Sequence, residues 1–115
     1  MSVRIDPTQI GEAVARRPYA YVVTASPTDG PHVRAVVVRW NGDAFVVRVG
    51  PRTTNNVSRS STVTIVWPPL AAGECRNEFD DHTVIADCAA ACTDTGDSHE
   101  LTARPTAAVG HRPAR

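Results

Sequence analysis

Short runs rich in apolar residues recur along most of the chain, several with apolar and polar residues in partial alternation, and such runs are typical of β-strands. Valine supplies many of the apolar positions, and clusters rich in proline, glycine or asparagine separate the runs. The first three runs are expected to pair as a meander, because short turns connect them. The pattern predicts strands at 19–26, 31–40, 43–49, 62–67, 82–92, 98–103 and 106–111.

Two segments depart from this alternation and are expected to be helical. Asp6, followed by proline, is a favourable helix start, and apolar residues then recur at helical spacing, which predicts a helix at 7–16. The segment 50–61 is polar and interrupts the strands, and Thr53 or Thr54 is suited to cap a short helix within it. Both helices would be short elements flanking the sheet.

Turn signals separate the predicted elements. A proline-glycine cluster at 27–30 and the dipeptide Asn41-Gly42 predict turns, a loop is expected at 70–73, and 94–97 has the composition of a turn. No repeat, linker or low-complexity tract divides the chain. We therefore predict one mainly β domain over the whole chain, built as a small antiparallel barrel because closure removes exposed strand edges.

The charged residues exclude several function classes. All 12 basic residues are arginine, and 12 acidic residues balance them to a net charge of zero. Without lysine the chain can form neither a Schiff base with an aldehyde cofactor nor a phosphate-loop lysine contact. A balanced charge gives no broad field for nucleic acid. Because no apolar run is long enough for a membrane span or a signal peptide, we expect a cytoplasmic protein without a membrane or nucleic-acid partner.

The cysteines are expected to be free thiols rather than disulfides or metal ligands. Cys75, Cys88 and Cys92 are odd in number, which favours a reducing compartment. Together with His82 or His99 they offer metal-binding atoms. On a flat strand, however, Cys88 and Cys92 would lie roughly 13 Å apart, too far for one tetrahedral metal. Only a bend or a helix would bring them together, so we predict no metal site.

Candidate ligand-binding residues join the second predicted strand to the polar segment. Arg34, Arg39, Arg48 and Arg52 lie within 19 positions and are opposed only by Asp43. Hydroxyl and amide side chains follow at a possible helix start, where free N–H groups and a positive dipole end suit phosphate. Valines between the first two arginines would form a flat apolar wall. The combination suits a planar aromatic ring with a phosphate tail, although such arginines are often simply solvated or paired with carboxylates.

The same stretch carries a family resemblance. The strand 34–39, Arg-Ala-Val-Val-Val-Arg, resembles the Arg-x-Val-Leu-Leu-Lys strand of the pyridoxamine 5′-phosphate oxidase-like, FMN-binding split-barrel family. The segment 51–53, Pro-Arg-Thr, resembles that family's Ser-Arg-Lys phosphate turn, and the order of elements fits over 18–69. The resemblance implies a six-stranded antiparallel split β-barrel with short flanking helices. It also implies a homodimer with two flavin sites between its subunits.

The resemblance further implies a cofactor, an activity and eight site residues. FMN would supply the hydride chemistry, so the implied function is a flavin-binding oxidoreductase acting on a small organic substrate, with no catalytic side chain assigned. The implied cofactor contacts are Arg34, Val36, Val37 and Arg39 with the ring edge and ribityl chain, Arg52, Thr53 and Thr54 with the phosphate, and Asn56 with the same turn. A ninth candidate is Trp67, which ends a strong strand: such a ring is more typical of a core or interface, and the alternative is a place at the edge of the flavin pocket.

The chain departs from the family pattern at three positions. Arg39 and Thr53 stand where the family has lysines, and Pro51 stands where it has a serine. Threonine supplies no charge to an anion. Two alternatives to an FMN enzyme therefore stay open: an F420-dependent reductase, and a split barrel without catalysis that binds haem or another small molecule as an accessory protein. The C-terminal residues hold no clear substrate motif, so we do not predict vitamin B6 oxidation.

Overall fold

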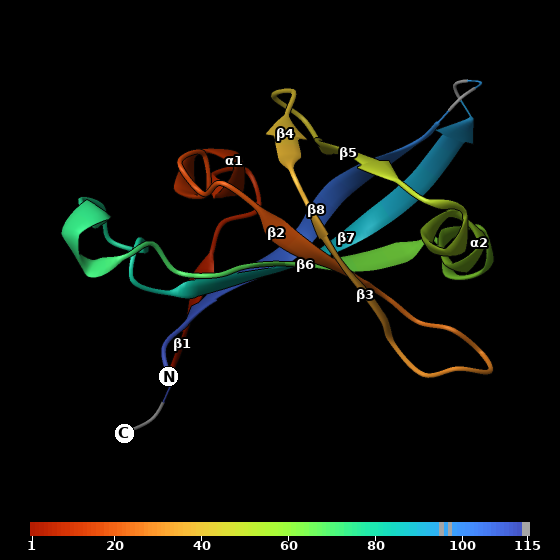
Figure 1. Cartoon of the computed structure of the whole chain (residues 1–115). Coiled ribbons are helices and arrows are strands. Elements are labelled where there is room, and N and C mark those ends of the chain that lie inside the picture. Colours follow the sequence, from red (N-terminus) through yellow and green to blue (C-terminus); the bar gives the residue numbers. More distant parts are fainter. Residues whose placement is uncertain (95, 97, 114–115) are drawn as a thin grey trace.

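Strands are the main regular elements of the computed structural model, which describes residues 1–94, 96 and 98–113. The mainly β class predicted from the alternation is confirmed (Figure 1). Among the described residues, no helix is both long and apolar enough to cross a membrane. In chain order the elements are strand β1 (Ser2–Ile5), helix α1 (Ile10–Ala13), strands β2 (Ala20–Thr24), β3 (His32–Val36), β4 (Val38–Trp40) and β5 (Phe45–Val49), helix α2 (Pro51–Ser60), strand β6 (Thr62–Trp67), the 3₁₀ turn η1 (Ala72–Glu74), and strands β7 (Thr83–Asp94) and β8 (His99–His111).

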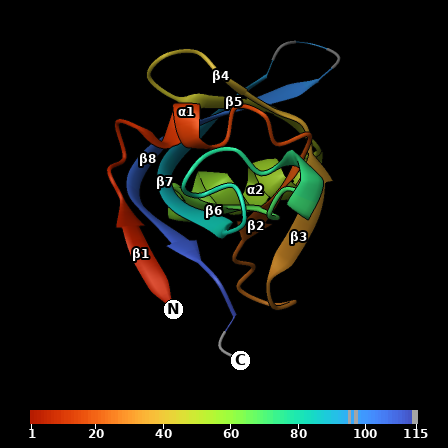
Figure 2. The ribbon, with the colours of Figure 1, turned by 90° about the vertical axis from the view of Figure 1, so that its left-hand side faces the viewer.

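One antiparallel sheet curls into the barrel. Its strand order is β3-β2-β6-β7-β8-β5-β4, and β1 pairs with β8 beside this path. Strands β3 and β4 lie at opposite ends of the order, yet only Val37 separates them in the chain. The segment 32–40 therefore crosses from one end of the sheet to the other and closes the barrel (Figure 1). Figure 2 shows the sheet curling from β1 and β8 on the left to β3 on the right.

The core lies inside the curled sheet, where alternate residues of each strand point inward. Three aromatic rings form its densest part: the Phe45 centroid lies 4.6 Å from that of Trp40 and 4.9 Å from that of Trp67. Helices α1 and α2 contribute apolar residues to the same cluster. The buried core residues are Ile5, Ile10, Val14, Ala20, Val22, Phe45, Val47, Val57, Val63, Ile65, Trp67, Val84, Ala86, Cys88, Leu101, Ala103 and Ala108.

Most predicted strands are found, with one break. The runs at 19–26, 43–49, 62–67 and 82–92 correspond to β2, β5, β6 and β7. The meander is confirmed in its pairings, β2 with β3 and β4 with β5. Its middle strand is divided at Val37. The sheet has eight strands, whereas the pattern predicted seven and the resemblance implied six. The loop expected at 70–73 runs into η1.

The N-terminal segment differs from the prediction in two ways. Residues Ser2–Ile5 form a strand that the pattern did not reveal, and the helix spans only Ile10–Ala13 instead of 7–16. Asp6 does not cap this helix. Its Oδ1 accepts hydrogen bonds from the backbone N–H and the hydroxyl of Thr8, at 2.9 and 2.7 Å. Asp6 thus closes its own local turn, which competes with helix formation.

Helix α2 begins earlier than predicted. Gly50 is the residue before the helix and Pro51 is its first residue, a position where the missing N–H costs nothing. A cap at Thr53 or Thr54 is therefore wrong, because both lie inside the helix. The Thr54 hydroxyl donates back to the Gly50 carbonyl at 3.0 Å. The helix ends at Ser61, whose φ of 57° is left-handed.

The two strands predicted at 98–103 and 106–111 are one continuous strand, β8. The register between β7 and β8 shifts opposite Asp87 and Cys88, where Pro105 stands in β8. Along this stretch β8 has a strand partner on one side only, a position where a sheet tolerates proline. The turn predicted at 94–97 includes positions 95 and 97, which lie outside the described residues.

Candidate anion-binding site

A pocket of about 370 Å³ opens where β3, β5 and the first turn of α2 meet. Helix α2 starts immediately after β5, so its N-terminus lies at the end of that strand. Four of the nine residues predicted from the sequence come together here, two from β3 and two from α2. The lining consists of His32, Arg34, Ala35 and Val36 from β3, Arg48 and Val49 from β5, and Gly50, Pro51, Arg52 and Thr53 at the start of α2.

The first turn of α2 presents hydrogen-bond donors to this pocket. The first N–H groups of a helix have no acceptor within the helix, and Pro51 has no N–H at all. Gly50 carries no side chain, and no side chain caps the helix. The backbone N–H groups of Arg52 and Thr53 are therefore available to a ligand. The positive end of the helix dipole favours an anion at the same place.

Three arginines give the pocket a positive charge. Within the described part of the chain, no carboxylate lies within 4.0 Å of the guanidinium of Arg34 or Arg48. Arg34 Nη1 donates to the neighbouring carbonyl of Val33 at 3.0 Å. Arg52 pairs with Asp29 at 3.2 Å, but both side chains are more than half exposed, so water screens this pair. The uncompensated charge favours an anionic ligand.

Asn56 supports the pocket from behind instead of lining it. Its side chain is 6% exposed, and Nδ2 donates to the hydroxyl of Thr24 at 2.9 Å. This bond fastens α2 to β2 and so holds the first turn of α2 in place. Thr54 also acts within the helix, through its bond to Gly50. Asn56 and Thr54 therefore position the predicted phosphate turn without facing the cavity.

His32 lines the pocket, although the sequence did not single it out. Its side chain is 7% exposed. Burial, and then the charges of Arg34 and Arg52, lower the pKa of the imidazole. The sequence held one signal for His32: alternate residues of a strand face the same side, so residue 32 shares a face with residues 34 and 36. The direction of that face became visible only with β5 and α2 in place.

Three predicted residues lie elsewhere. Val37 sits between β3 and β4 and is 73% exposed. The side chain of Arg39, on β4, is mostly exposed and its Nη2 lies 4.0 Å from Glu100. Trp67 is buried in the core. Arg39 and Trp67 line a second, larger groove between α1 and the β4–β5 hairpin, so the structure does not bring them to the anion pocket.

Comparison with known proteins finds likeness in structure rather than in sequence. No family model matches the chain, and neither does any curated protein sequence. A Corynebacterium glutamicum protein described as a candidate pyridoxamine 5′-phosphate oxidase matches with a TM-score of 0.66 at 11% identity, over 95% of this chain and 90% of its own. The FAD-binding protein of Mycobacterium smegmatis matches at 0.62 and 15% identity, over 94% of this chain and 95% of its own. The haem storage protein HutZ of Vibrio cholerae matches at 0.62 and 15% identity, over 90% of this chain and 91% of its own.

These solved structures share the architecture described above. The chain has the split-barrel fold of the pyridoxamine 5′-phosphate oxidase-like proteins. At these identities the likeness establishes the fold alone. What this split barrel binds must therefore be inferred from its own side chains.

The larger groove of the split barrel has an aromatic floor and a volume of about 700 Å³. Trp40, Phe45 and Trp67 form that floor, and α1 covers it. A Cβ at Gly11 would lie 2.4 Å from the Trp40 ring, so only glycine allows α1 to pack this closely. The rings are core residues with one edge toward the groove, and their contacts with each other account for their position.

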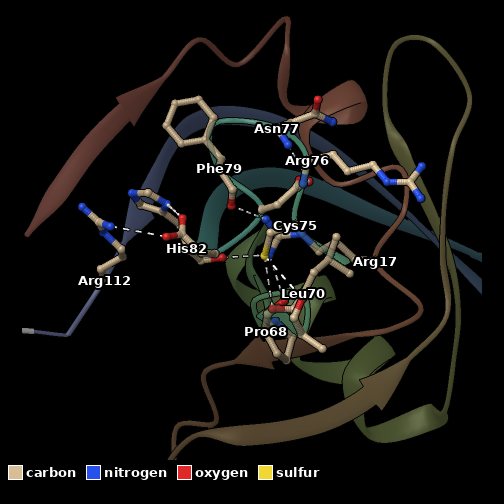
Figure 3. A network of polar contacts seen from close by, with 12 residues as sticks. Arg17, Pro68, Leu70, Cys75, Arg76, Asn77, Phe79, His82 and Arg112 are labelled. Atoms are coloured by element: carbon tan, nitrogen blue, oxygen red, sulfur yellow. Dashed lines mark hydrogen bonds and ion pairs between the residues drawn. The ribbon is translucent and has the colours of Figure 1, made fainter. Parts of the chain in front are cut away.

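A second polar cluster, centred on Arg17, fastens the segment 68–82 to the barrel (Figure 3). The guanidinium of Arg17 is buried and donates to three backbone carbonyls, those of Pro68 and His82 at 2.8 Å and that of Phe79 at 2.6 Å. Burial lowers the pKa of Arg17, against the opposing effect of nearby carboxylates. Because its Nη donors are engaged by the fold, we assign Arg17 a structural role.

Asp80 completes this cluster. It is 3% exposed, and its Oδ2 accepts the backbone N–H groups of Arg76 and Asn77, each at 2.8 Å. Arg16 donates to the same carboxylate. The two backbone N–H groups are the main cause that lowers the pKa of Asp80. Asp80 is thus a satisfied buried carboxylate that shapes the loop.

The cysteines offer neither a disulfide nor a reactive thiolate at the pocket. Cys75, Cys88 and Cys92 are all free. Burial raises the pKa of Cys88 to about 12, so this thiol stays protonated. Cys88 and Cys92 lie on the extended strand β7, not on a helix. Among the residues that the structure describes, no group of three or more His, Cys, Asp or Glu is placed to hold a metal ion.

Proposed function

We propose that this split barrel binds FMN, with the phosphate in the pocket at the start of α2, and acts as an oxidoreductase on a small organic substrate. The observation that carries the proposal is the convergence of Arg34, Arg48 and Arg52 with the first turn of α2 on one pocket. Charge-assisted bonds from arginine and free N–H groups at a helix start are the usual ligands of a phosphate. FMN, when bound, supplies the hydride chemistry.

The donor set of the pocket fits a phosphate despite the absence of lysine. Thr53 offers its N–H and hydroxyl, and Arg48 brings a charge from β5 to the same cavity. Arg48 thus compensates for the charge that threonine lacks. Val36 and Val49 add apolar surface beside the arginines, against which a ring can pack.

We also propose a homodimer in which a second copy covers the outer face of the sheet. Side chains on this face are apolar in one continuous row across five strands. Next to the row, Val33, Val37 and Tyr19 are 46%, 73% and 41% exposed. An exposed apolar surface of this kind marks an interface. In register, the row consists of Ala35, Tyr21, Val66, Ile85 and Val109.

The row reaches the anion pocket, which supports a cofactor site between subunits. Ala35 belongs to the row and also lines the pocket, and Arg34 and Val36 flank it on β3. A partner seated on the row would therefore stand beside the bound phosphate. Sedimentation of the wild type and of Tyr21→Arg tests the dimer, which the charged variant should dissociate. A monomeric wild type would contradict it. The free cysteines support a cytoplasmic location, which we propose as well.

FMN titration tests the proposed function. Arg52→Ala should weaken FMN binding about 10- to 100-fold, because a charge-assisted bond to phosphate contributes about 1.5–3 kcal/mol. Arg59→Ala, in the last turn of the same helix, is the matched control and should bind FMN like the wild type. Riboflavin, which lacks the phosphate, should bind both variants equally. Equal FMN affinity of Arg52→Ala and the wild type would remove Arg52 from the site.

Parallel titrations with F420 and haem distinguish the two alternative functions. The haem storage protein among the structural relatives makes a haem-binding accessory protein the second candidate. Binding of haem without FMN would favour that function. Binding of F420 without FMN would favour an F420-dependent reductase. The absorbance spectrum of the purified protein gives the first indication, because flavin and haem absorb in different bands.

A further inference from the structure

His32 and Thr53 are the two buried polar side chains that face the anion pocket without a partner. His32 is 7% exposed and Thr53 is 2% exposed, and both line the cavity. Within the described residues, neither the imidazole nor the Thr53 hydroxyl makes a hydrogen bond. Among the described residues, Nε of Arg17 is the one fully buried side-chain nitrogen or oxygen atom without a partner, so the polar atoms of His32 and Thr53 are open to the pocket. Two largely buried residues whose polar atoms are free toward one cavity, beside a helix start, point to a ligand that bonds to them.

Each of the three elements that line the pocket brings an arginine to it. Strand β3 contributes Arg34, β5 contributes Arg48, and α2 contributes Arg52. Asp29, in the segment before β3, pairs with Arg52 at 3.2 Å. On β2 the register partner of His32 is Thr24, which carries no charge. His32 therefore lies among three cations and a single carboxylate.

We propose that His32 is a proton-linked ligand of the phosphate group: neutral in the free protein, it takes up a proton from solvent when the anion binds and donates its N–H to a phosphate oxygen. The proposal rests on the proposed anion site and adds a residue and a pH dependence to it. Thr53 would donate its hydroxyl to the same group. The chain has no lysine to add a permanent positive charge to the site. Protonated His32 would add one, and only while an anion is bound.

The sign of the pH dependence follows from the two states of the site. In the free protein, burial and the arginines hold the pKa of His32 below its usual value of about 6.5. A phosphate dianion beside the ring reverses this charge balance, so the pKa of His32 rises on binding. Binding therefore takes up a proton. Between the two pKa values, affinity rises up to about tenfold for each unit by which the pH falls, and it levels off outside them.

The direct test is an NMR titration of the histidine ring protons in the wild-type protein. The pKa of His32 is measured in the free protein, with FMN and with inorganic phosphate. The ring signals of the other three histidines are assigned by substituting each in turn. The remaining signal is then that of His32, even if a variant at position 32 does not fold. We expect the pKa of His32 to rise with both ligands. The ring signals of His111, whose Nδ1 contacts the Ser2 hydroxyl at the far end of β8, should not respond to either ligand.

Affinity measurements provide the second test. FMN affinity is measured for the wild type and for His32→Gln between about pH 5 and 8, and the ratio of the two affinities is followed with pH. The phosphate of FMN titrates identically in both measurements, so its own pH dependence drops out of the ratio. The ratio should rise as the pH falls, whereas the ratio of wild type to His111→Gln should stay flat. A flat ratio for His32→Gln would overturn the proposal.

The outcomes separate this proposal from the proposed function. A shift of His32 with phosphate but no FMN binding would support the role of His32 and contradict the flavin function. FMN binding without any shift of His32 would overturn the role of His32 and leave the flavin function standing. No shift with either ligand would also overturn the role of His32.

Discussion

Replacing Arg17 by methionine tests whether one buried guanidinium holds the segment 68–82 on the barrel. The substitution keeps the length and the apolar stem of the side chain but removes all its donors. The carbonyls of Pro68, Phe79 and His82 would each lose a charge-assisted bond of 2.6 to 2.8 Å. Because these bonds join the segment after α1 to a loop more than 50 positions away, their loss should loosen the fold itself.

The expected loss of stability is about 3–5 kcal/mol. Each buried carbonyl left without a partner costs about 1–3 kcal/mol, and three are affected. Part of this loss of stability is offset, because methionine removes the unfavourable burial of a charged guanidinium, which the lowered pKa of Arg17 indicates. Arg16→Met is the matched neighbour. Arg16 is 40% exposed and bonds to Asp80 and the Glu74 carbonyl, so its loss should cost only about 1 kcal/mol.

Urea unfolding of the wild type and both variants measures the difference. Arg17→Met should move the midpoint well below that of Arg16→Met at an unchanged slope. Arg17→Lys should fall between them, because one ammonium cannot reach all three carbonyls. Equal midpoints for Arg17→Met and Arg16→Met, or a loss below about 1 kcal/mol in Arg17→Met, would refute the role given to these bonds.

Two further changes test the packing of α1 and the charge of Asp80. Gly11→Ala should lower the free energy of unfolding by about 1–3 kcal/mol, since its Cβ would meet the Trp40 ring at 2.4 Å. Gly73→Ala is the control and should change stability little, because no atom lies within 4 Å of a Cβ there. Equal urea midpoints for the two variants would contradict this. Because the pKa of Asp80 is lowered, the stability it provides is complete above about pH 4 and is lost as the pH falls through that pKa. Asp80→Asn should therefore unfold more easily than the wild type near neutral pH, and the two stabilities should converge in acid; parallel pH curves would contradict this.

The fold could be predicted where the pattern is local. Asn41-Gly42 predicted a hairpin turn, and the Asn41 side chain accepts the N–H groups of Asp43 and Ala44 there, with Gly42 at a φ of 99°. The alternation of buried and exposed residues gave β2 and β6 in the same way. Strand β1 could not be found, because only Ile5 among its residues is buried and its pairing depends on β8 at the other end of the chain.

The candidate site was predicted in part. The sequence placed Arg34 and Val36 at the ring and ribityl chain of a cofactor, and Arg52 and Thr53 at its phosphate. The structure brings these four residues to one pocket. The sequence did not reveal His32, whose character depends on burial by other elements. The role of Arg48 as a lining residue was also hidden, since β5 shows its orientation only once it is paired.

The sequence by itself determined the local features: where most of the strands lie, which residues share a strand face, and where arginine and hydroxyl residues concentrate. Only the tertiary structure decided which faces meet. At Val37 the chain leaves one end of the sheet for the other, so Arg34 and Arg39 serve different cavities although five positions separate them. The physical reason is that local pattern sets the direction of a side chain within its own strand, whereas long-range strand pairing sets what lies opposite it.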